Sequence, residues 1–356
     1  MRPSRALIDL DALRHNYRLA RERHGGRAFA VVKANAYGHG VLPCVRALAG
    51  EADGFAVAFI DEARALRDSG IVAPILLLEG VFDTAELIDA ARLDLWPAVH
   101  HRAQIEMIEK AVLPAPLYVW LKVNSGMNRC GFLPGAVHQA WKRLVVSGKT
   151  KHIGFMTHFA RADEPDCPVT GEQIRVFDEA THNLPGERSM ANSGAILAWP
   201  GARRDWARPG IMLYGADPLP REGNGLQPVM TLESRVVAVR ELALGEPLGY
   251  GGRFIAPRPT RVGLVAIGYA DGYPRSAPDG TPVAVDGLYA TIAGRVSMDM
   301  LTVDLTDLPD AGVGSEVELW GARVPVNRVA QGVNTISYEL LCNVKRVAFE
   351  YRGGGN

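Results

Sequence analysis

The chain has 356 residues, 47% of them hydrophobic and 22% charged, with a formal net charge of zero. A single (β/α)8 barrel needs about 250 residues, so the length predicts a second, smaller domain. The neutral charge argues against nucleic acid or an acidic membrane surface as a partner.

The cysteines and the apolar runs exclude further classes of protein. The four cysteines form no CxxC pair, so the sequence indicates neither a zinc site nor a disulfide framework. Asp9 and Asp11 stand where a signal peptide would need an apolar run. The longest apolar stretch, residues 71–78, contains Pro74 and is too short to span a bilayer. We therefore expect a cytoplasmic protein without a metal site and without a membrane partner.

From about residue 28 to 207, short apolar runs alternate with amphipathic segments. Between the runs, segments such as 61–69 and 171–183 place apolar residues three apart on one helical face. Eight strand–helix units in succession predict an α/β fold, a (β/α)8 TIM barrel, with the weakest pattern in the last unit. The predicted strands are residues 29–33, 55–58, 74–78, 93–98, 117–123, 153–157, 188–191 and 205–207.

The pattern changes near residue 228. Apolar and polar residues alternate with period two over 231–242 and in parts of 260–267, 281–305 and 315–321, which is typical of strands. The segment 218–228, rich in Gly and Pro, reads as a linker. We therefore expect a barrel over residues 1–228 and a mostly β domain over 229–356.

The first candidate for chemistry is Lys33, in the string AVVKANAYGHG over residues 30–40. A lysine that closes a barrel strand faces the active site. Partial desolvation there makes its neutral amine available as a nucleophile that can form a Schiff base. A lysine that ends a strand is also common as a plain surface residue, so Lys33 by itself does not decide the function.

The string around Lys33 resembles the cofactor-lysine motif of the alanine racemase family, which uses pyridoxal phosphate on a barrel followed by a β domain. The resemblance implies an isomerase that interconverts L-alanine and D-alanine with two bases, and that either supplies D-alanine for peptidoglycan or degrades it. Further strings match the family in the same order: VNSGMNRCGF (123–132), MTHFA (156–160), ANSGA (191–195), ARPGIMLYG (207–215), LGYGGRF (248–254), IGYADGYPR (267–275), GRVSMDM (294–300) and NTISYELLC (334–342).

A phosphate site is expected after strands seven and eight, where barrels commonly bind phosphate. Ser193 offers a hydroxyl there, and Gly210 and Ile211 offer backbone N–H groups that a glycine lets approach closely. The resemblance adds Tyr37 and Tyr338 as phenolic donors to the phosphate, and Asn192 as a further cofactor contact.

The resemblance places Arg208 at the pyridine nitrogen of the cofactor and His158 under or beside the ring, bonded to Arg208. Arginine keeps its proton, so the ring is a weaker electron sink than a full pyridinium. This favours return of the proton to Cα over side reactions.

Racemisation needs a base on each face of a planar carbanion. Lys33 serves one face, and the resemblance assigns Tyr250 of LGYGG to the other. Tyrosine has a reference pKa of about 10, so its surroundings must activate it. Because the β domain of this family reaches the barrel of the other subunit, we expect a homodimer with shared active sites.

The resemblance also implies how the substrate is held. Arg129 binds its carboxylate, Met298 of the partner offers a backbone N–H, and Tyr269 of the partner narrows the entrance to small side chains. Asp299 supports the surroundings of Tyr250. Lys122, seven residues before Arg129, matches a lysine that in many members carries a carbamate. Asn124, Cys130 and Gly194 depart from the commonest family pattern, which bears on substrate breadth and stability, not on reaction class.

Three other functions are weighed against this one. A racemase of broader scope, acting on serine, lysine or arginine, would share the site and differ at the entrance. A non-catalytic cofactor carrier resembles the first half only and lacks the strings LGYGG, GYADGYPR and SMDM. A basic amino-acid decarboxylase would need an acidic residue where Arg208 stands.

Overall fold

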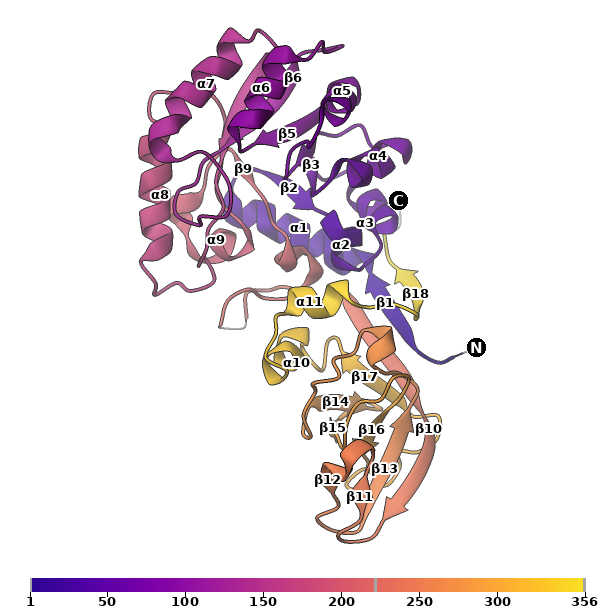
Figure 1. Cartoon of the computed structure of the whole chain (residues 1–356). Coiled ribbons are helices and arrows are strands. Elements are labelled where there is room, and N and C mark those ends of the chain that lie inside the picture. The colour runs from indigo at the N-terminus through magenta and orange to yellow at the C-terminus, as the bar shows by residue number, and fades with distance from the viewer. Residues whose placement is uncertain (1, 221–222, 355–356) are drawn as a thin grey trace.

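The computed structural model describes residues 2–220 and 223–354, which form a barrel and a β domain lying beside it (Figure 1). Eight parallel strands close the barrel in chain order from β2 to β9. Most of them are short and rich in apolar residues, because both faces of such a strand are buried, by side chains inside and by helices outside. Every predicted run overlaps one of them, which confirms the predicted barrel: β2 (Arg27–Val31), β3 (Gly54–Val57), β4 (Ile75–Leu77), β5 (Leu95–Val99), β6 (Leu117–Lys122), β7 (Thr150–Met156), β8 (Arg188–Ser189) and β9 (Trp206–Ala207).

Among the described residues no α-helix directly follows the last barrel strand, so the prediction of eight strand–helix units is wrong in that unit. β9 is followed only by the short turn η3 (Ile211–Tyr214). α1 (Leu10–His24), which comes before the barrel, packs against α3, α9 and η3 and so covers this part of the barrel. The Asp9 carboxylate caps α1 by accepting hydrogen bonds from the amides of Asp11 and Ala12.

The other helices follow their strands around the outside of the barrel. They are α2 (Lys33–Tyr37), α3 (Val41–Leu48), α4 (Ile60–Asp68), α5 (Thr84–Arg92), α6 (Arg102–Lys110), α7 (Val137–Val146), α8 (Val169–Ala180) and α9 (Ser193–Ala198), with short turns η1 (Pro134–Ala136) and η2 (Pro200–Ala202). No helix in the described ranges is long and apolar enough to cross a membrane.

The β domain is built on an eight-stranded sheet in the order β13–β16–β15–β14–β17–β10–β1–β18. Because β13 also pairs with β10, the first six strands of this order join into a ring. The predicted alternating segments are confirmed as strands: β10 (Met230–Leu242), β13 (Thr260–Val265), β14 (Pro282–Val285), β15 (Leu288–Ile292), β16 (Leu301–Asp304) and β17 (Glu316–Trp320), with a small hairpin of β11 (Pro247–Leu248) and β12 (Phe254–Ile255).

Both ends of the chain meet in this sheet. β1 (Arg5–Asp9) pairs antiparallel with β10 and parallel with β18 (Ala348–Arg352). Residues 5–9 thus pair with the β domain, although the predicted division places them with the barrel.

Two helices that the sequence did not predict, α10 (Val326–Gly332) and α11 (Ser337–Cys342), lie between barrel and sheet (Figure 1). α11 packs against α2, so a segment near the end of the chain reaches the barrel mouth. The predicted linker forms no helix or strand in its described parts, 218–220 and 223–228.

Candidate active site

A cavity of about 380 Å³ opens where the carboxyl ends of the barrel strands meet. This is the end at which barrel enzymes carry their active sites. Eleven of the residues predicted for the site line it together: Lys33, Tyr37, Lys122, Arg129, His158, Asn192, Ser193, Arg208, Gly210, Ile211 and Tyr338. The sequence positions that carry chemistry therefore converge in space.

The sequence predicts that Lys33 closes its strand, but in the structure Lys33 lies after the end of the strand. β2 ends at Val31, and Lys33 opens the short turn α2. The next four residues, Ala34 to Tyr37, have φ between 50° and 54°, so the chain turns in the left-handed sense. That conformation costs roughly 1–2 kcal/mol for each non-glycine residue, and the surrounding contacts must offset it.

Side chains from neighbouring elements hold this left-handed turn. The Glu62 carboxylate accepts a hydrogen bond from the Ala34 amide at 2.7 Å. The buried His39 ring donates from Nδ1 to the carbonyls of Ala36 and Tyr37. The Tyr37 ring stacks on Tyr214 with centroids 4.8 Å apart. These contacts fix the direction in which Lys33 and Tyr37 leave the barrel wall.

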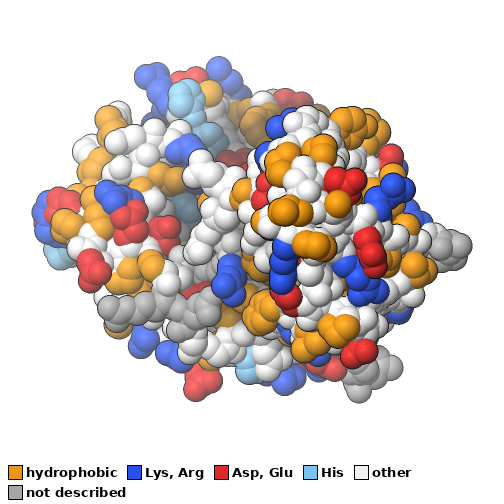
Figure 2. All heavy atoms as spheres, turned by 90° about the horizontal axis from the view of Figure 1, so that it is seen from below, with side chains coloured by type: hydrophobic (Ala, Val, Ile, Leu, Met, Phe, Trp, Pro, Cys, Tyr) orange, Lys and Arg blue, Asp and Glu red, His pale blue; other side chains and the backbone are white. Residues whose placement is uncertain are grey.

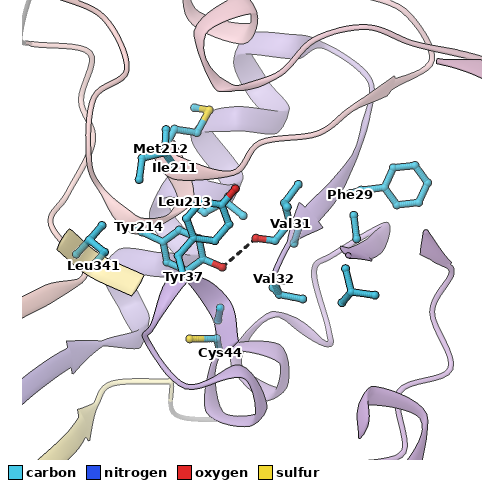
Figure 3. Close-up of a cluster of buried hydrophobic side chains, with 14 of the residues drawn as sticks. Phe29, Val31, Val32, Tyr37, Cys44, Ile211, Met212, Leu213, Tyr214 and Leu341 are labelled. Carbon is cyan, nitrogen blue, oxygen red and sulfur yellow. Dashed lines mark hydrogen bonds between the residues drawn. The ribbon is translucent and has the colours of Figure 1, made fainter. Parts of the chain in front are cut away.

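The stacked rings belong to a cluster of buried hydrophobic side chains (Figure 3). Tyr214 donates from its hydroxyl to the carbonyl of Val31, the last residue of β2, at 2.9 Å. Burial raises the pKa of Tyr37 well above its usual value and that of Tyr338 to about 12. Both phenols are therefore hydrogen-bond donors at neutral pH.

Ser193 and Gly210 form a closely packed cradle beside Tyr37. The Ser193 hydroxyl oxygen accepts hydrogen bonds from the amides of Gly210 at 2.9 Å and Met212 at 3.3 Å. Its proton remains available for an anion in the cavity. The Gly210 N–H, predicted to face the phosphate, is thus bonded to Ser193. A Cβ at Gly210 would stand 2.6 Å from the Tyr37 hydroxyl oxygen, so a side chain there would displace the Tyr37 ring.

Arg208 follows β9 directly and is 4% exposed. Its guanidinium donates to the Ser189 hydroxyl and to the carbonyls of Thr157 and Met190. Desolvation lowers its pKa to about 10, so it is a cation at neutral pH. These bonds use Nη1 and Nη2; in the described part of the chain Nε donates to no protein group.

The predicted bond between His158 and Arg208 is not formed in the structure, where the Arg208 guanidinium donates to Ser189 and to two backbone carbonyls. His158 nevertheless lines the cavity with Arg208. Desolvation, with the positive charge of Arg208 second, places the pKa of His158 well below its usual value. The ring is therefore neutral at physiological pH.

Arg129 lies on the loop after β6, which folds back on itself. Phe132 donates its amide to the Lys122 carbonyl, and Asn124 donates its amide to the Phe132 carbonyl. The Asn124 side-chain oxygen accepts from the amides of Gly126 and Asn128. Asn124, which departs from the family pattern, thus organises the loop that carries Arg129.

The cavity is strongly positive. Lys33, Lys122, Arg129 and Arg208 line it with a single carboxylate, that of Glu79. None of these four cations has an ion pair within 4.0 Å among the described residues. Lys122 is only 5% exposed, and burying an unpaired charge is costly. The site therefore fits ligands that bring negative charge, such as a phosphate and a carboxylate.

Four predicted residues of the β domain do not line this cavity. Tyr250 is 68% exposed and Met298 53% exposed. Tyr269 lies in the turn η5 (Tyr269–Asp271), and its amide donates to the Ser297 carbonyl beside Met298. The Asp299 carboxylate accepts from Arg346 at 2.9 Å, not from Tyr250. These four residues of the β domain therefore form no part of the cavity of their own chain.

Sequence reasoning missed several residues that line the cavity. Leu78 and Glu79 directly follow β4, so the rule that strand ends face the site would have found them. Cys342 stands four residues after Tyr338 on α11, and that spacing puts both on one face of the helix.

Comparisons with known proteins agree with this arrangement. Residues 8–218 match the family described as "Alanine racemase, N-terminal domain", and residues 229–351 match "Alanine racemase, C-terminal domain". The chain is similar to an alanine racemase of Azoarcus sp. (strain BH72), 71% identical over 99% of this chain and 100% of that protein.

Solved structures are also similar to this chain over nearly its whole length. The biosynthetic alanine racemase of Pseudomonas aeruginosa superposes with a TM-score of 0.96 at 49% identity, covering 99% of this chain and 100% of that one. The alanine racemase of Bartonella henselae, described with covalently bound pyridoxal phosphate, gives a TM-score of 0.90 at 31% identity, covering 99% and 100%.

Proposed function

We propose that this chain, which belongs to the alanine racemase family and interconverts L-alanine and D-alanine, works through Lys33 in its own barrel and Tyr250 of a second copy. The observation that carries the proposal is the convergence of Lys33, Arg208 and the Ser193–Gly210 cradle in one cavity, while Tyr250 stands exposed outside it.

The cavity fits pyridoxal phosphate, the cofactor of this family. Ser193, Tyr37 and Tyr338 present hydroxyl donors toward a phosphate, and Gly210 leaves the space that a side chain would fill. The Arg208 Nε–H, which has no protein acceptor in the described chain, is available for the pyridine nitrogen. When bound, the cofactor supplies the electron withdrawal that makes the α-proton of alanine acidic.

The residues of this chain supply the proton transfers. Lys33 Nζ holds the cofactor in the resting enzyme, and afterwards takes or returns the α-proton on the face from which D-alanine loses it. Tyr250 Oη does the same on the opposite face. Because Arg208 stays a cation and does not give up its proton, return of the α-proton to carbon is favoured over side reactions.

The second copy is needed because Tyr250 is 68% exposed and does not line the cavity of its own chain. The barrel mouth carries an exposed aromatic pair, Phe59 after β3 and Phe82 after β4, with ring centroids 6.1 Å apart. Seen from the β-domain end, hydrophobic side chains also gather among charged ones (Figure 2). A homodimer that sets the Tyr250 face on the partner's barrel would cover such surfaces.

Arg129 binds the substrate carboxylate, with the Met298 amide and Tyr269 of the partner copy closing the entrance around a small side chain. Lys122 carries a carbamate, which replaces an unpaired buried cation by an anion able to orient Arg129. Carbon-13 bicarbonate gives a test: the holoenzyme is expected to show a carbamate resonance in NMR that Lys122→Met lacks.

The reaction is tested by following optical rotation from L-alanine and from D-alanine, with and without added pyridoxal phosphate. Loss of rotation from both, dependent on the cofactor, is expected. Equal turnover of L-lysine would contradict the assignment to alanine. Carbon dioxide release from an amino acid would contradict a racemase.

A further inference from the structure

Tyr250 stands on a turn with little stiffness of its own. The turn η4 (Tyr250–Gly252) is flanked and filled by glycines, and Gly249, Gly251 and Gly252 have φ of 70°, 73° and 54°. Glycine has the greatest conformational freedom to lose. The Tyr250 hydroxyl makes no hydrogen bond with the described residues of its own chain. Something outside the turn must therefore define where this phenol points.

The hairpin that carries the turn has little apolar support. β11 and β12 pair over only two residues each. They rest on a small cluster of Leu242, Ala256 and Val262 that is separate from the main core of the protein. An isolated two-stranded hairpin is marginal in water, so packing alone leaves the Tyr250 turn loosely held.

Arg253, the residue directly after the turn, connects it to the body of the domain. Its Nε lies 3.2 Å from one carboxylate oxygen of Asp279, and its Nη2 donates to the other at 3.4 Å. The same Nη2 donates to the carbonyls of Ala277 and Gly294, each at 3.1 Å. The Asp279 carboxylate also accepts from the Gly294 amide at 2.6 Å. Arg253, Asp279 and Gly294 thus form one bonded group, here called the clamp.

The clamp joins two pieces of the proposed shared site. Gly294 begins the loop that leads to Met298, and a Cβ on Gly249 would lie 4.0 Å from the next amide of that loop, Arg295. The clamp therefore fixes the Tyr250 turn relative to the Met298 loop, although neither Arg253 nor Asp279 lines the cavity of its own chain.

We propose that Arg253 is a positioning residue for the reaction: by bonding Asp279 and Gly294 it holds Tyr250 at the distance and angle that proton transfer in the partner's cavity needs. This rests on the proposed role of Tyr250 as a base. Arginine is suited to the task because its planar fork makes several bonds in fixed directions. A lysine there makes fewer and less directed bonds.

The test compares Arg253→Gln and Arg253→Lys with a matched control, Arg258→Gln. Arg258 lies in the same domain and pairs with the exposed Asp307, away from the Tyr250 turn. The first measurement is amide hydrogen exchange of the holoenzyme by mass spectrometry. Faster deuterium uptake over residues 247–256 is expected in Arg253→Gln and not in the control.

The second measurement separates the two faces of the substrate. In D2O, Lys33 exchanges the α-proton of D-alanine and returns a deuteron to the same face, which needs no contribution from Tyr250. Misplacing a reacting group by about 1 Å costs up to roughly 100-fold. Arg253→Gln is therefore expected to lose roughly 10- to 100-fold in racemisation while the same-face exchange falls far less, with Arg253→Lys between it and the wild type.

If Arg253→Gln lost the same-face exchange of the D-alanine α-proton as strongly as racemisation, the cause would be a general loss of structure and the proposal would be overturned. An Arg253→Gln enzyme that matches Arg258→Gln in both measurements would also overturn it. If Arg253→Gln does not fold, Arg253→Lys, which keeps the charge, carries the same two readouts. Tyr250→Phe separates the levels of the claim. If it racemises normally, the proposed function fails; if it is inactive while the Arg253 variants behave normally, only the clamp fails.

Discussion

The barrel mouth and the face of the β domain that carries Tyr250 hold their functional groups in opposite ways. In the barrel, Arg208, Tyr37 and Ser193 are buried and fixed by hydrogen bonds and ring stacking before any ligand arrives. On the β domain, Tyr250 and Met298 are exposed on turns. The difference fits the proposal that one copy of the chain prepares the binding site and that Tyr250 serves as the second base in the site of another copy.

Removing the Lys33 amine has the largest expected effect, because it removes the barrel's contribution to the reaction. Lys33→Ala is expected to abolish racemisation in both directions, because the proposal gives Lys33 two tasks, holding the cofactor and serving as one of the two bases. Polarimetry measures the loss of racemisation, and the visible absorbance of gel-filtered protein measures the loss of bound cofactor. Lys110→Ala, on the exposed side of α6, is the matched control and keeps full activity. Racemisation by Lys33→Ala above roughly 1% of the wild type would count against the assignment.

Removing the phenolic hydroxyl of Tyr250 removes the base that the β domain is proposed to supply and leaves the barrel site unchanged. Tyr250→Phe is expected to lower racemisation by about 10²- to 10⁴-fold, the usual contribution of a positioned acid–base group. The absorbance of bound cofactor and the same-face exchange of D-alanine persist. Tyr289→Phe, an exposed tyrosine of the same domain whose hydroxyl donates to the Arg323 carbonyl, is the control. Loss of cofactor absorbance in Tyr250→Phe would contradict this account, because it would show that Tyr250 is needed to hold the cofactor.

Adding a methyl group to the Ser193–Gly210 cradle tests the claim that the barrel site is already shaped before the cofactor binds. Gly210→Ala places a carbon 2.6 Å from the Tyr37 hydroxyl oxygen, and relief of such a clash costs about 1–3 kcal/mol. The affinity of apoenzyme for pyridoxal phosphate, measured by fluorescence titration, is expected to fall roughly tenfold or more. Gly135→Ala, where a Cβ meets nothing within 4 Å, leaves it unchanged; equal affinity of both variants would argue against the cradle.

The smallest expected effect concerns the support beneath the barrel site. Burial lowers the pKa of His39 to about 4. Below pH 6.5 the unfolded chain binds a proton there that the folded chain does not, so stability falls as pH drops toward 4. The contribution is about 2 kcal/mol between pH 7 and 5.

His39→Gln is expected to flatten that part of the pH dependence, measured by urea denaturation at one protein concentration. His138→Gln, an exposed histidine on α7, keeps the slope of the wild type. A His39→Gln profile parallel to that of the wild type would show that another group causes the acid loss.

The parts of the fold that follow from local periodicity could be predicted. The eight apolar runs became barrel strands, and the rule that strand ends face the site located Ser193, Arg208 and Lys33 in one cavity. The roles of these residues came from the resemblance to a family and not from spacing.

Features decided by tertiary contacts could not be predicted. The five residues of β1 carry a strand pattern, but nothing local tells that they pair with β10 and β18. The left-handed turn over Ala34–Tyr37 contains no glycine, so propensity argues against it; Glu62 and His39 make it stable. That α1 covers the barrel where the eighth helix was expected depends on packing between segments far apart in sequence.

The central claim, that each site takes Lys33 from one copy and Tyr250 from the other, is tested most directly by mixing two inactive variants. Lys33→Ala and Tyr250→Phe homodimers, dissociated and reassociated in equal amounts, form mixed dimers with one intact site and one doubly altered site. The account predicts recovery of about a quarter of wild-type activity at random association. Mixed dimers isolated by two affinity tags that show no activity above the parents would contradict it.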